Sequence, residues 1–289
     1  MKKAILFPGQ GAQAPGMGKE LYDSSKAAKE IFDMLEVIRP GTIEQCFNGT
    51  KEELSLTVNT QPCIFAVSMA NAAAITNELF DCNKKETYPL VAGFSVGEVA
   101  ALVYAGVLSM QDGFKAVIER AKLMHECAGK TKGAMSAVLR LETAKVEELA
   151  AISGVYPVNY NCPGQLVVSG EADKMAAFNE SVAGAGGRAM PLAVSGAFHS
   201  PYMQAAADNF RKFLDTLEFN APKLAVYSNV TGKLYPSNTT EIKNLFAKQI
   251  ANPVLWQQSV QDMLHSGCEE FIEMQPGKVL TGLVAKIKG

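Results

Sequence analysis

Short apolar runs and longer amphipathic stretches take turns along the chain. Residues 4–7 are apolar and end at Pro8 and Gly9, which predicts a buried strand that leads into a glycine-rich loop. Residues 88–93 predict a second strand, and residues 99–107 predict a helix that begins just after it. Strands that alternate with helices indicate an α/β fold with a mainly parallel sheet covered on both faces. The other elements predicted in this larger part are helices over 20–38, 59–79, 112–127, 203–217, 242–250 and 260–265 and strands over 224–227 and 270–273.

The middle of the chain has a tighter rhythm. Between residues 134 and 194 the pattern predicts strand, helix, strand, strand, helix, strand, which is the split βαβ order (βαββαβ) of a small ferredoxin-like domain. Because the longer rhythm resumes afterwards, we expect this unit to be an insertion over residues 130–196. Residues 1–129 and 197–289 are then expected to form one core.

The composition of the 289 residues narrows the class of protein. Hydrophobic residues make up 48% and charged residues 19%, as in soluble globular chains, and the net charge of −2 argues against a nucleic-acid partner. The six cysteines are scattered without a Cys-x-x-Cys pair, so we expect reduced thiols, a cytoplasmic protein and no metal site. No apolar run approaches the roughly 18 residues of a membrane span, so we expect no membrane association.

The segment Gly93-Phe94-Ser95-Val96-Gly97 lies between a predicted strand and a predicted helix. In that position a Gly-x-Ser-x-Gly motif forms a tight, strained turn that exposes the serine hydroxyl. The amide of Val96, at the start of the helix, then favours an oxyanion. The alternative is a glycine-lined turn in which Ser95 only caps the helix. The flanking elements favour Ser95 as a nucleophile.

A serine nucleophile needs a base, and the chain has three histidines. His125 and His265 fall on or at the end of predicted helices, where packing or capping is their usual role. His199 lies between a predicted strand and a predicted helix, where open α/β sheets place their sites, and it is the predicted base. No acidic residue stands out as a third member, so a dyad whose histidine is oriented by a backbone carbonyl is the simpler hypothesis.

Gly9, Gly11 and Ala14 formally match a dinucleotide-binding fingerprint. Pro15 and Gly16 oppose the helix that such a site requires, so the loop is instead expected to supply amide donors beside Ser95.

Arg120 borders the apolar stripe of its predicted helix. A partly buried guanidinium needs an anionic partner. That partner is either an internal carboxylate or a carboxylate on the substrate.

Several ordered motifs together resemble the malonyl-CoA:acyl carrier protein transacylase family over nearly the whole chain. They are Phe7-Pro8-Gly9-Gln10-Gly11-Ala12-Gln13, Gly93-Phe94-Ser95-Val96-Gly97-Glu98, Arg120, Asn161-Cys162-Pro163-Gly164-Gln165, Ala197-Phe198-His199-Ser200, Gln249 with Asn252-Pro253-Val254 and Trp256, and Pro276-Gly277-Lys278-Val279-Leu280-Thr281-Gly282. The resemblance implies a hydrolase-like α/β core with an inserted ferredoxin-like subdomain. Two positions depart from it, since the family usually has histidine at Phe94 and glycine at Gln275.

The resemblance also implies roles for particular residues. They are Ser95 as the acylated nucleophile, His199 as its base, Gln249 as the carbonyl that orients His199, Gln10 and Val96 as oxyanion donors, Arg120 as the clamp for the malonyl carboxylate, Asn161 as a further substrate-binding residue, and Phe198 with Val96 as a malonyl-selective pair.

The activity implied is malonyl transfer from malonyl-CoA to the phosphopantetheine thiol of acyl carrier protein, for fatty acid synthesis. The reaction is ping-pong through a serine ester, with no cofactor and no metal. Lys130 and Lys132 are candidates for a basic patch facing an acidic carrier, and a monomer is expected. The alternatives are a discrete acyltransferase of a polyketide synthase, a serine hydrolase, and a catalytically silent binding subunit.

Overall fold

The computed structural model describes residues 2–79, 90–194 and 196–289. Within these ranges a parallel sheet contains β1 (Lys2–Phe7), β2 (Leu90–Gly93) and β7 (Cys268–Glu273) in the order β2-β1-β7. The predicted strand at 224–227 is reduced to two isolated bridges, a parallel one from Val226 to Val91 of β2 and an antiparallel one from Tyr227 to Leu234. The prediction of residues 88 and 89 as strand lies outside the described residues.

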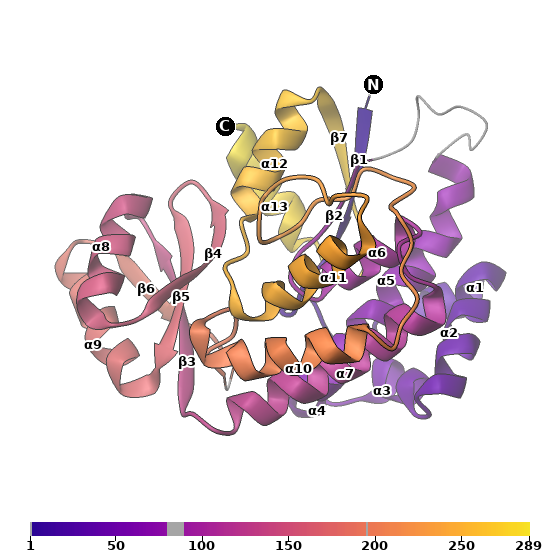
Figure 1. The fold of residues 1–289 in the computed structure, drawn as a ribbon, viewed down its shortest axis with the longest axis horizontal. Coiled ribbons are helices and arrows are strands. Elements are labelled where there is room, and N and C mark those ends of the chain that lie inside the picture. Colours follow the sequence, from indigo (N-terminus) through magenta and orange to yellow (C-terminus); the bar gives the residue numbers. More distant parts are fainter. Residues whose placement is uncertain (1, 80–89, 195) are drawn as a thin grey trace.

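Both faces of the parallel sheet are covered, as the sequence predicts. Ile5 and Phe7 of β1 belong to one core cluster, whereas Ala4 and Leu6 belong to another, because successive side chains of a strand point to opposite faces. The helices of the larger cluster are α2 (Lys26–Ile38), α5 (Thr57–Leu79), α6 (Gly97–Tyr104), α7 (Met110–Ala128), α10 (Gln204–Leu214) and α11 (Thr239–Lys248). Those of the smaller cluster are α12 (Trp256–His265) and α13 (Val279–Lys288) (Figure 1).

Three short helices and α13 differ from the predicted pattern. The single helix predicted over 20–38 is divided into α1 (Lys19–Ser24) and α2, because Ser25 is extended and caps α2 through its side chain. Helices α3 (Thr42–Asn48), α4 (Lys51–Ser55) and α13 were not predicted. No helix among the described residues is long and apolar enough to cross a membrane.

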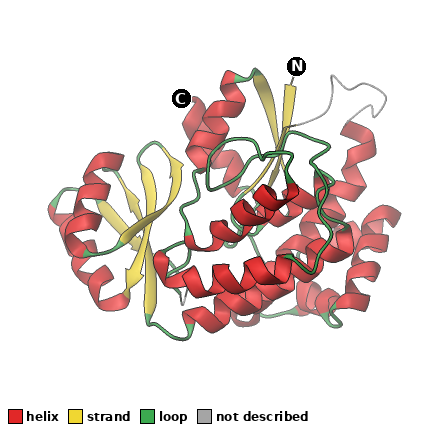
Figure 2. Ribbon diagram, viewed as in Figure 1, coloured by secondary structure: helices red, strands yellow, loops and turns green. Residues whose placement is uncertain are grey.

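A second, antiparallel sheet lies beside the core, at the left of Figure 2. It is built from β3 (Gly133–Leu139), β4 (Tyr156–Cys162), β5 (Gln165–Glu171) and β6 (Arg188–Pro191), in the order β4-β5-β3-β6. Helices α8 (Thr143–Ser153) and α9 (Ala172–Gly184) pack on one face through their own apolar cluster. The predicted βαββαβ order is therefore confirmed, while the boundaries 130 and 196 stay a prediction.

Strand β4 connects the small sheet to the core by backbone hydrogen bonds. The N–H of Tyr160 donates to the carbonyl of Val254 at 3.0 Å, and the N–H of Val254 donates to the carbonyl of Val158 at 2.8 Å. This pairing holds Asn159 opposite Val254, just before α12. Asn159 is thereby held at the junction between the two sheets, beside the cavities described next.

Candidate active site

Ser95 occupies a strained turn between β2 and α6. Its φ of 52° lies in the left-handed region, which a serine adopts only when its surroundings impose it. A Cβ on Gly93 would lie 2.0 Å from the backbone of Gly97, and a Cβ on Gly97 would lie 2.2 Å from the carbonyl oxygen of Phe7. Both glycines are therefore required for α6 to begin so close to the sheet, and this close approach forces the turn.

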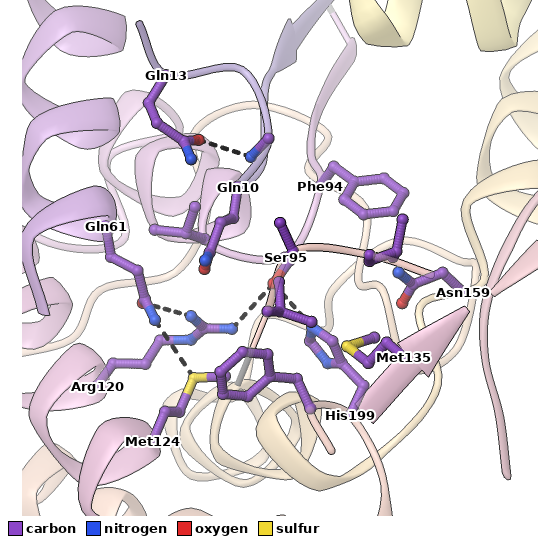
Figure 3. A pocket seen from close by; sticks show the side chains of 16 residues that line it. Gln10, Gln13, Gln61, Phe94, Ser95, Arg120, Met124, Met135, Asn159 and His199 are labelled. Carbon is purple, nitrogen blue, oxygen red and sulfur yellow. Dashed lines mark hydrogen bonds between the residues drawn. The ribbon is translucent and has the colours of Figure 1, made fainter. Parts of the chain in front are cut away.

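His199 also has a left-handed backbone, with a φ of 60°, and is almost completely buried. Its Nε2 lies 2.8 Å from Oγ of Ser95 (Figure 3). Its Nδ1 lies 2.8 Å from the backbone carbonyl of Gln249. Because a carbonyl only accepts hydrogen bonds, Nδ1 carries the proton and donates it. Nε2 is then the acceptor for the Ser95 hydroxyl, which is the arrangement that a general base needs.

The environment keeps the imidazole neutral. Burial, and then the nearby Arg120 cation, lower the pKa of His199 from 6.5 to about 4, while the hydrogen bonds to backbone groups of Gln249 and Asn252 oppose that shift. At neutral pH His199 is therefore in the unprotonated form that accepts a proton from Ser95.

We expect the reactivity of Ser95 to fall only as the pH drops through about 4, since the neutral imidazole is the active form and is lost below its pKa. The measurement is the rate of inactivation by phenylmethanesulfonyl fluoride between about pH 4 and 8, with circular dichroism as the control for folding. Half-maximal reactivity near 6.5, the ordinary value for histidine, would show that the site does not perturb His199.

Arg120 is completely buried on α7, and neutral groups surround its guanidinium. Nη1 donates to Oε1 of Gln61 at 2.5 Å, while Nη2 donates to Oε1 of Gln249 at 2.7 Å and to Oγ of Ser95 at 3.3 Å. No carboxylate in the described part of the chain forms an ion pair with it within 4.0 Å. Burial lowers the pKa of Arg120 to about 10, so it is still a cation at neutral pH. Of the two partners that the sequence left open, a carboxylate on the substrate fits this geometry better.

These side chains surround one cavity of about 270 Å³. Phe94, Met124, Met135 and Phe198 contribute apolar walls. Gln10, from the loop after β1, and Val96, at the N-terminus of α6, also line it. Within the described residues the backbone N–H groups of Gln10 and Val96 make no hydrogen bond, so both are available to an oxyanion.

Asn161 does not line this cavity. It lines a neighbouring cavity of about 250 Å³ between the small sheet and α13. Asn159 and Phe94 line both cavities, so the two cavities are adjacent. The Oδ1 atoms of Asn159 and Asn161 are buried and accept no hydrogen bond from the described residues. They are unsatisfied acceptors on two residues that line the neighbouring cavity.

Phe94 fills the position where the resembling family usually has histidine. Its ring packs edge-on against Trp256 with centroids 5.5 Å apart, and it forms part of the wall of both cavities. Its backbone lies so close to Gly9 that a Cβ there would approach the Phe94 carbonyl oxygen to 2.7 Å. Phe94 thus replaces a polar side chain by an apolar wall and leaves the geometry of Ser95 and His199 intact.

No role was predicted from the sequence for four residues that contact the site residues or one another: Gln61, Glu98, Asn229 and Tyr235. Oδ1 of Asn229 accepts the N–H of Ser95 at 2.8 Å, and its Nδ2 donates to the carbonyl of Gly93 at 2.7 Å, so Asn229 braces the strained turn. Glu98 could have been noticed, since a carboxylate at the start of a completely apolar helix is unusual.

The other two histidines lie away from this cavity, and the dinucleotide-binding hypothesis is not supported by the fold. His125 and His265 are exposed near the ends of α7 and α12. The loop after β1 reaches Gly18 without a helix, so the dinucleotide fingerprint lacks the helix N-terminus that would bind phosphates.

The fold and the serine–histidine pair match a known class of protein. A family model described as acyl transferase domain matches residues 5–287 of the chain. The malonyl CoA-acyl carrier protein transacylase of Bacillus subtilis (strain 168) is 38% identical over 295 residues, covering 99% of this chain and 90% of the relative.

Solved structures agree with that match. The malonyl CoA-acyl carrier protein transacylase of Clostridium perfringens has a TM-score of 0.92 and 36% identity, over 99% of this chain and 90% of that one. A malonyl-transacylase in complex with its type II PKS acyl-carrier protein has a TM-score of 0.93 and 33% identity, over 99% and 93%. The chain therefore belongs to the acyl transferase family, in the group of malonyl CoA-acyl carrier protein transacylases.

Proposed function

We propose that the protein transfers the malonyl group of malonyl-CoA to the phosphopantetheine thiol of acyl carrier protein, through an ester on Ser95, for fatty acid synthesis. One observation carries this proposal: Oγ of Ser95 lies 2.8 Å from a neutral histidine and 3.3 Å from a buried guanidinium that forms no ion pair within 4.0 Å among the described residues. A nucleophile and a carboxylate receptor side by side suit an acyl group that ends in a carboxylate.

In the first half-reaction Oγ of Ser95 attacks the thioester carbonyl while Nε2 of His199 takes the hydroxyl proton. The N–H groups of Gln10 and Val96 stabilise the oxyanion. The carbon–sulfur bond then breaks, and the thiol of coenzyme A leaves with the proton from His199.

In the second half-reaction the carrier's thiol gives its proton to His199 and attacks the ester carbonyl. Ser95 leaves and recovers its proton, so the enzyme returns to its starting state. Throughout, Arg120 binds the malonyl carboxylate, and its planar, paired donors suit a carboxylate better than a lysine does. Neither a metal nor a cofactor takes part in these steps.

The neighbouring cavity suits the arm that both thioesters share. A pantetheine arm contains amide N–H groups, and the unpaired Oδ1 atoms of Asn159 and Asn161 are acceptors for them. This is the substrate-binding role that we propose for Asn161. The buried ring of Phe198, together with Val96, narrows the acyl cavity and favours malonyl over branched acyl groups.

The carrier is expected to approach from the side of the small sheet. Lys130 and Lys132, at the junction between α7 and β3, are exposed cations that suit an acidic partner. We propose a monomer that acts in the cytoplasm.

Incubation of the wild-type protein with malonyl-CoA tests this function. We expect the intact mass to rise by one malonyl group, peptide mapping to place it on Ser95, and holo acyl carrier protein to remove it. A protein that stays unmodified, or a label on another residue, contradicts the proposal. Rapid release of malonate without any carrier favours the hydrolase, and discharge only by a polyketide synthase carrier favours the polyketide pathway.

A further inference from the structure

Glu98 is a completely buried carboxylate that takes no part in the proposed acyl transfer. It lies in the first turn of α6, and three donors converge on it. Oε2 accepts the N–H of Asn229 at 3.1 Å and Nε2 of Gln249 at 3.2 Å, while Oε1 accepts the hydroxyl of Tyr235. This is the set of partners that an ionised carboxylate needs inside a protein.

The side-chain amide of Gln249 connects Glu98 to Arg120. Besides Glu98, Nε2 of Gln249 faces the carbonyl of Ser95 at 2.7 Å and Oδ1 of Asn229 at 3.1 Å. Because three oxygens surround Nε2, the orientation of the amide is settled and its Oε1 must face Arg120. The carboxylate and the guanidinium are therefore separated by a single amide group.

Glu98 and Arg120 are opposite charges buried in the same region of the core. In the part of the chain that the structure describes, Glu98 is the buried carboxylate and Arg120 the buried lysine or arginine; no other of either kind is buried. Burial raises the pKa of Glu98 to about 7, against its hydrogen bonds and the Arg120 cation, which lower it. At pH 8 Glu98 is ionised, and Arg120, with a pKa of about 10, is a cation.

We propose that Glu98 is the resident counter-ion of Arg120 and that its charge weakens the binding of the acyl carboxylate. The inference rests on the proposed function, in which Arg120 binds the malonyl group. A bound malonyl group brings a second negative charge to the same water-poor site, where like charges repel strongly. Looser binding of the malonyl group on Ser95 favours its transfer to the carrier, because tight binding of an intermediate lowers its free energy and so raises the barrier to the next step.

The substitution Glu98→Gln removes the charge and keeps the shape. The carbonyl of Ser95 and Oδ1 of Asn229 still hold the Gln249 amide, so Arg120 keeps its neutral contacts. Binding is measured by calorimetry at pH 8 in a Ser95→Ala background, which stops the covalent reaction. We expect the Kd of malonyl-CoA to fall about fivefold or more, and that of acetyl-CoA to change less than about twofold.

Glu119→Gln is the matched control. Glu119 precedes Arg120 on the same helix, but its side chain is partly exposed and pairs with Lys122 at 3.9 Å. Its loss removes one negative charge at the surface, where solvent screens it, so both Kd values should stay unchanged.

A pH series on the Ser95→Ala protein gives a second, independent measurement. The titratable groups that face Glu98 are Arg120 and Tyr235, with His199 beyond Gln249, and their pKa values of about 10, well above 10, and about 4 lie outside the interval from about pH 6 to 8. As Glu98 takes up a proton, malonyl-CoA should bind more tightly relative to acetyl-CoA. The coenzyme A phosphates are common to both donors and cancel in the ratio.

The outcomes separate this role from others. Weaker binding of malonyl-CoA by Glu98→Gln, or an equal change for both donors, overturns the inference and makes Glu98 a structural residue only. Should Glu98→Gln fail to fold, the pH series decides, and a constant ratio of the two Kd values overturns it. Failure of the proposed function is seen separately, as the absence of a malonyl ester on wild-type Ser95.

Discussion

Ser95→Ala is expected to abolish the acyl-enzyme and to lower malonyl transfer by a factor on the order of 10⁴ or more. The reason is that the substitution removes the hydroxyl that lies 2.8 Å from the neutral His199, and no other Ser, Thr, Tyr, Cys or Lys is among the described residues that line the cavity. Two measurements check it: the intact mass after incubation with malonyl-CoA, and the rate of malonyl transfer to holo acyl carrier protein.

The matched control is Ser259→Ala on α12, whose hydroxyl bonds only to the carbonyl of Leu255 one turn earlier. This variant should be labelled and should turn over like the wild type. If Ser95→Ala is still labelled to the wild-type extent, the nucleophile is another residue and the proposed mechanism is wrong.

Arg120→Ala is expected to lower malonyl transfer by a factor on the order of 10² to 10³, and acetyl transfer far less. A carboxylate that enters the cavity of this variant meets no lysine or arginine, since Arg120 is the only one among the described residues that line it. Steady-state rates with malonyl-CoA and acetyl-CoA test the difference. Equal losses for both donors would contradict a role for Arg120 in binding the malonyl carboxylate.

The same substitution also removes the cation nearest to the buried Glu98. We therefore expect a loss of roughly 1 to 3 kcal/mol in the free energy of unfolding, measured with urea. Arg120→Lys is the control that retains the charge. It should recover most of the stability but little of the malonyl transfer, because one ammonium cannot form the paired hydrogen bonds of a guanidinium.

The turn at Ser95 was predictable because the strand that ends at Gly93 and the helix that begins at Gly97 lie within a few residues of the serine. The steric need for Gly93 is also local, since its Cβ would meet Gly97, whereas Gly97 is required by the backbone of Phe7 at the end of β1, which only the structure shows. The split βαβ unit was predictable for a similar reason, since its hydrophobic period changes within short stretches. His199 could be singled out because the chain offers so few histidines.

Which cavity Asn161 lines was not predictable from its motif. It stands two residues after Asn159 on β4, and a strand advances about 3.3 Å per residue. Asn161 therefore lies roughly 6 to 7 Å further along the strand, in the next cavity. The segment 224–227 was wrongly predicted as a strand, and helix α13 was not predicted. Both depend on packing against the sheet rather than on their own hydrophobic pattern.

The sequence by itself determined the order of most elements and predicted Ser95 as nucleophile and His199 as its base, because these follow from local sterics, hydrophobic period and residue type. Only the tertiary structure decided that Arg120 forms no ion pair within 4.0 Å among the described residues and that the side chain of Gln249 contacts Arg120. That contact joins residues 129 positions apart, through a side-chain amide that leaves no periodic signal. The buried Glu98 behind them became meaningful only once three distant donors were seen to converge on it.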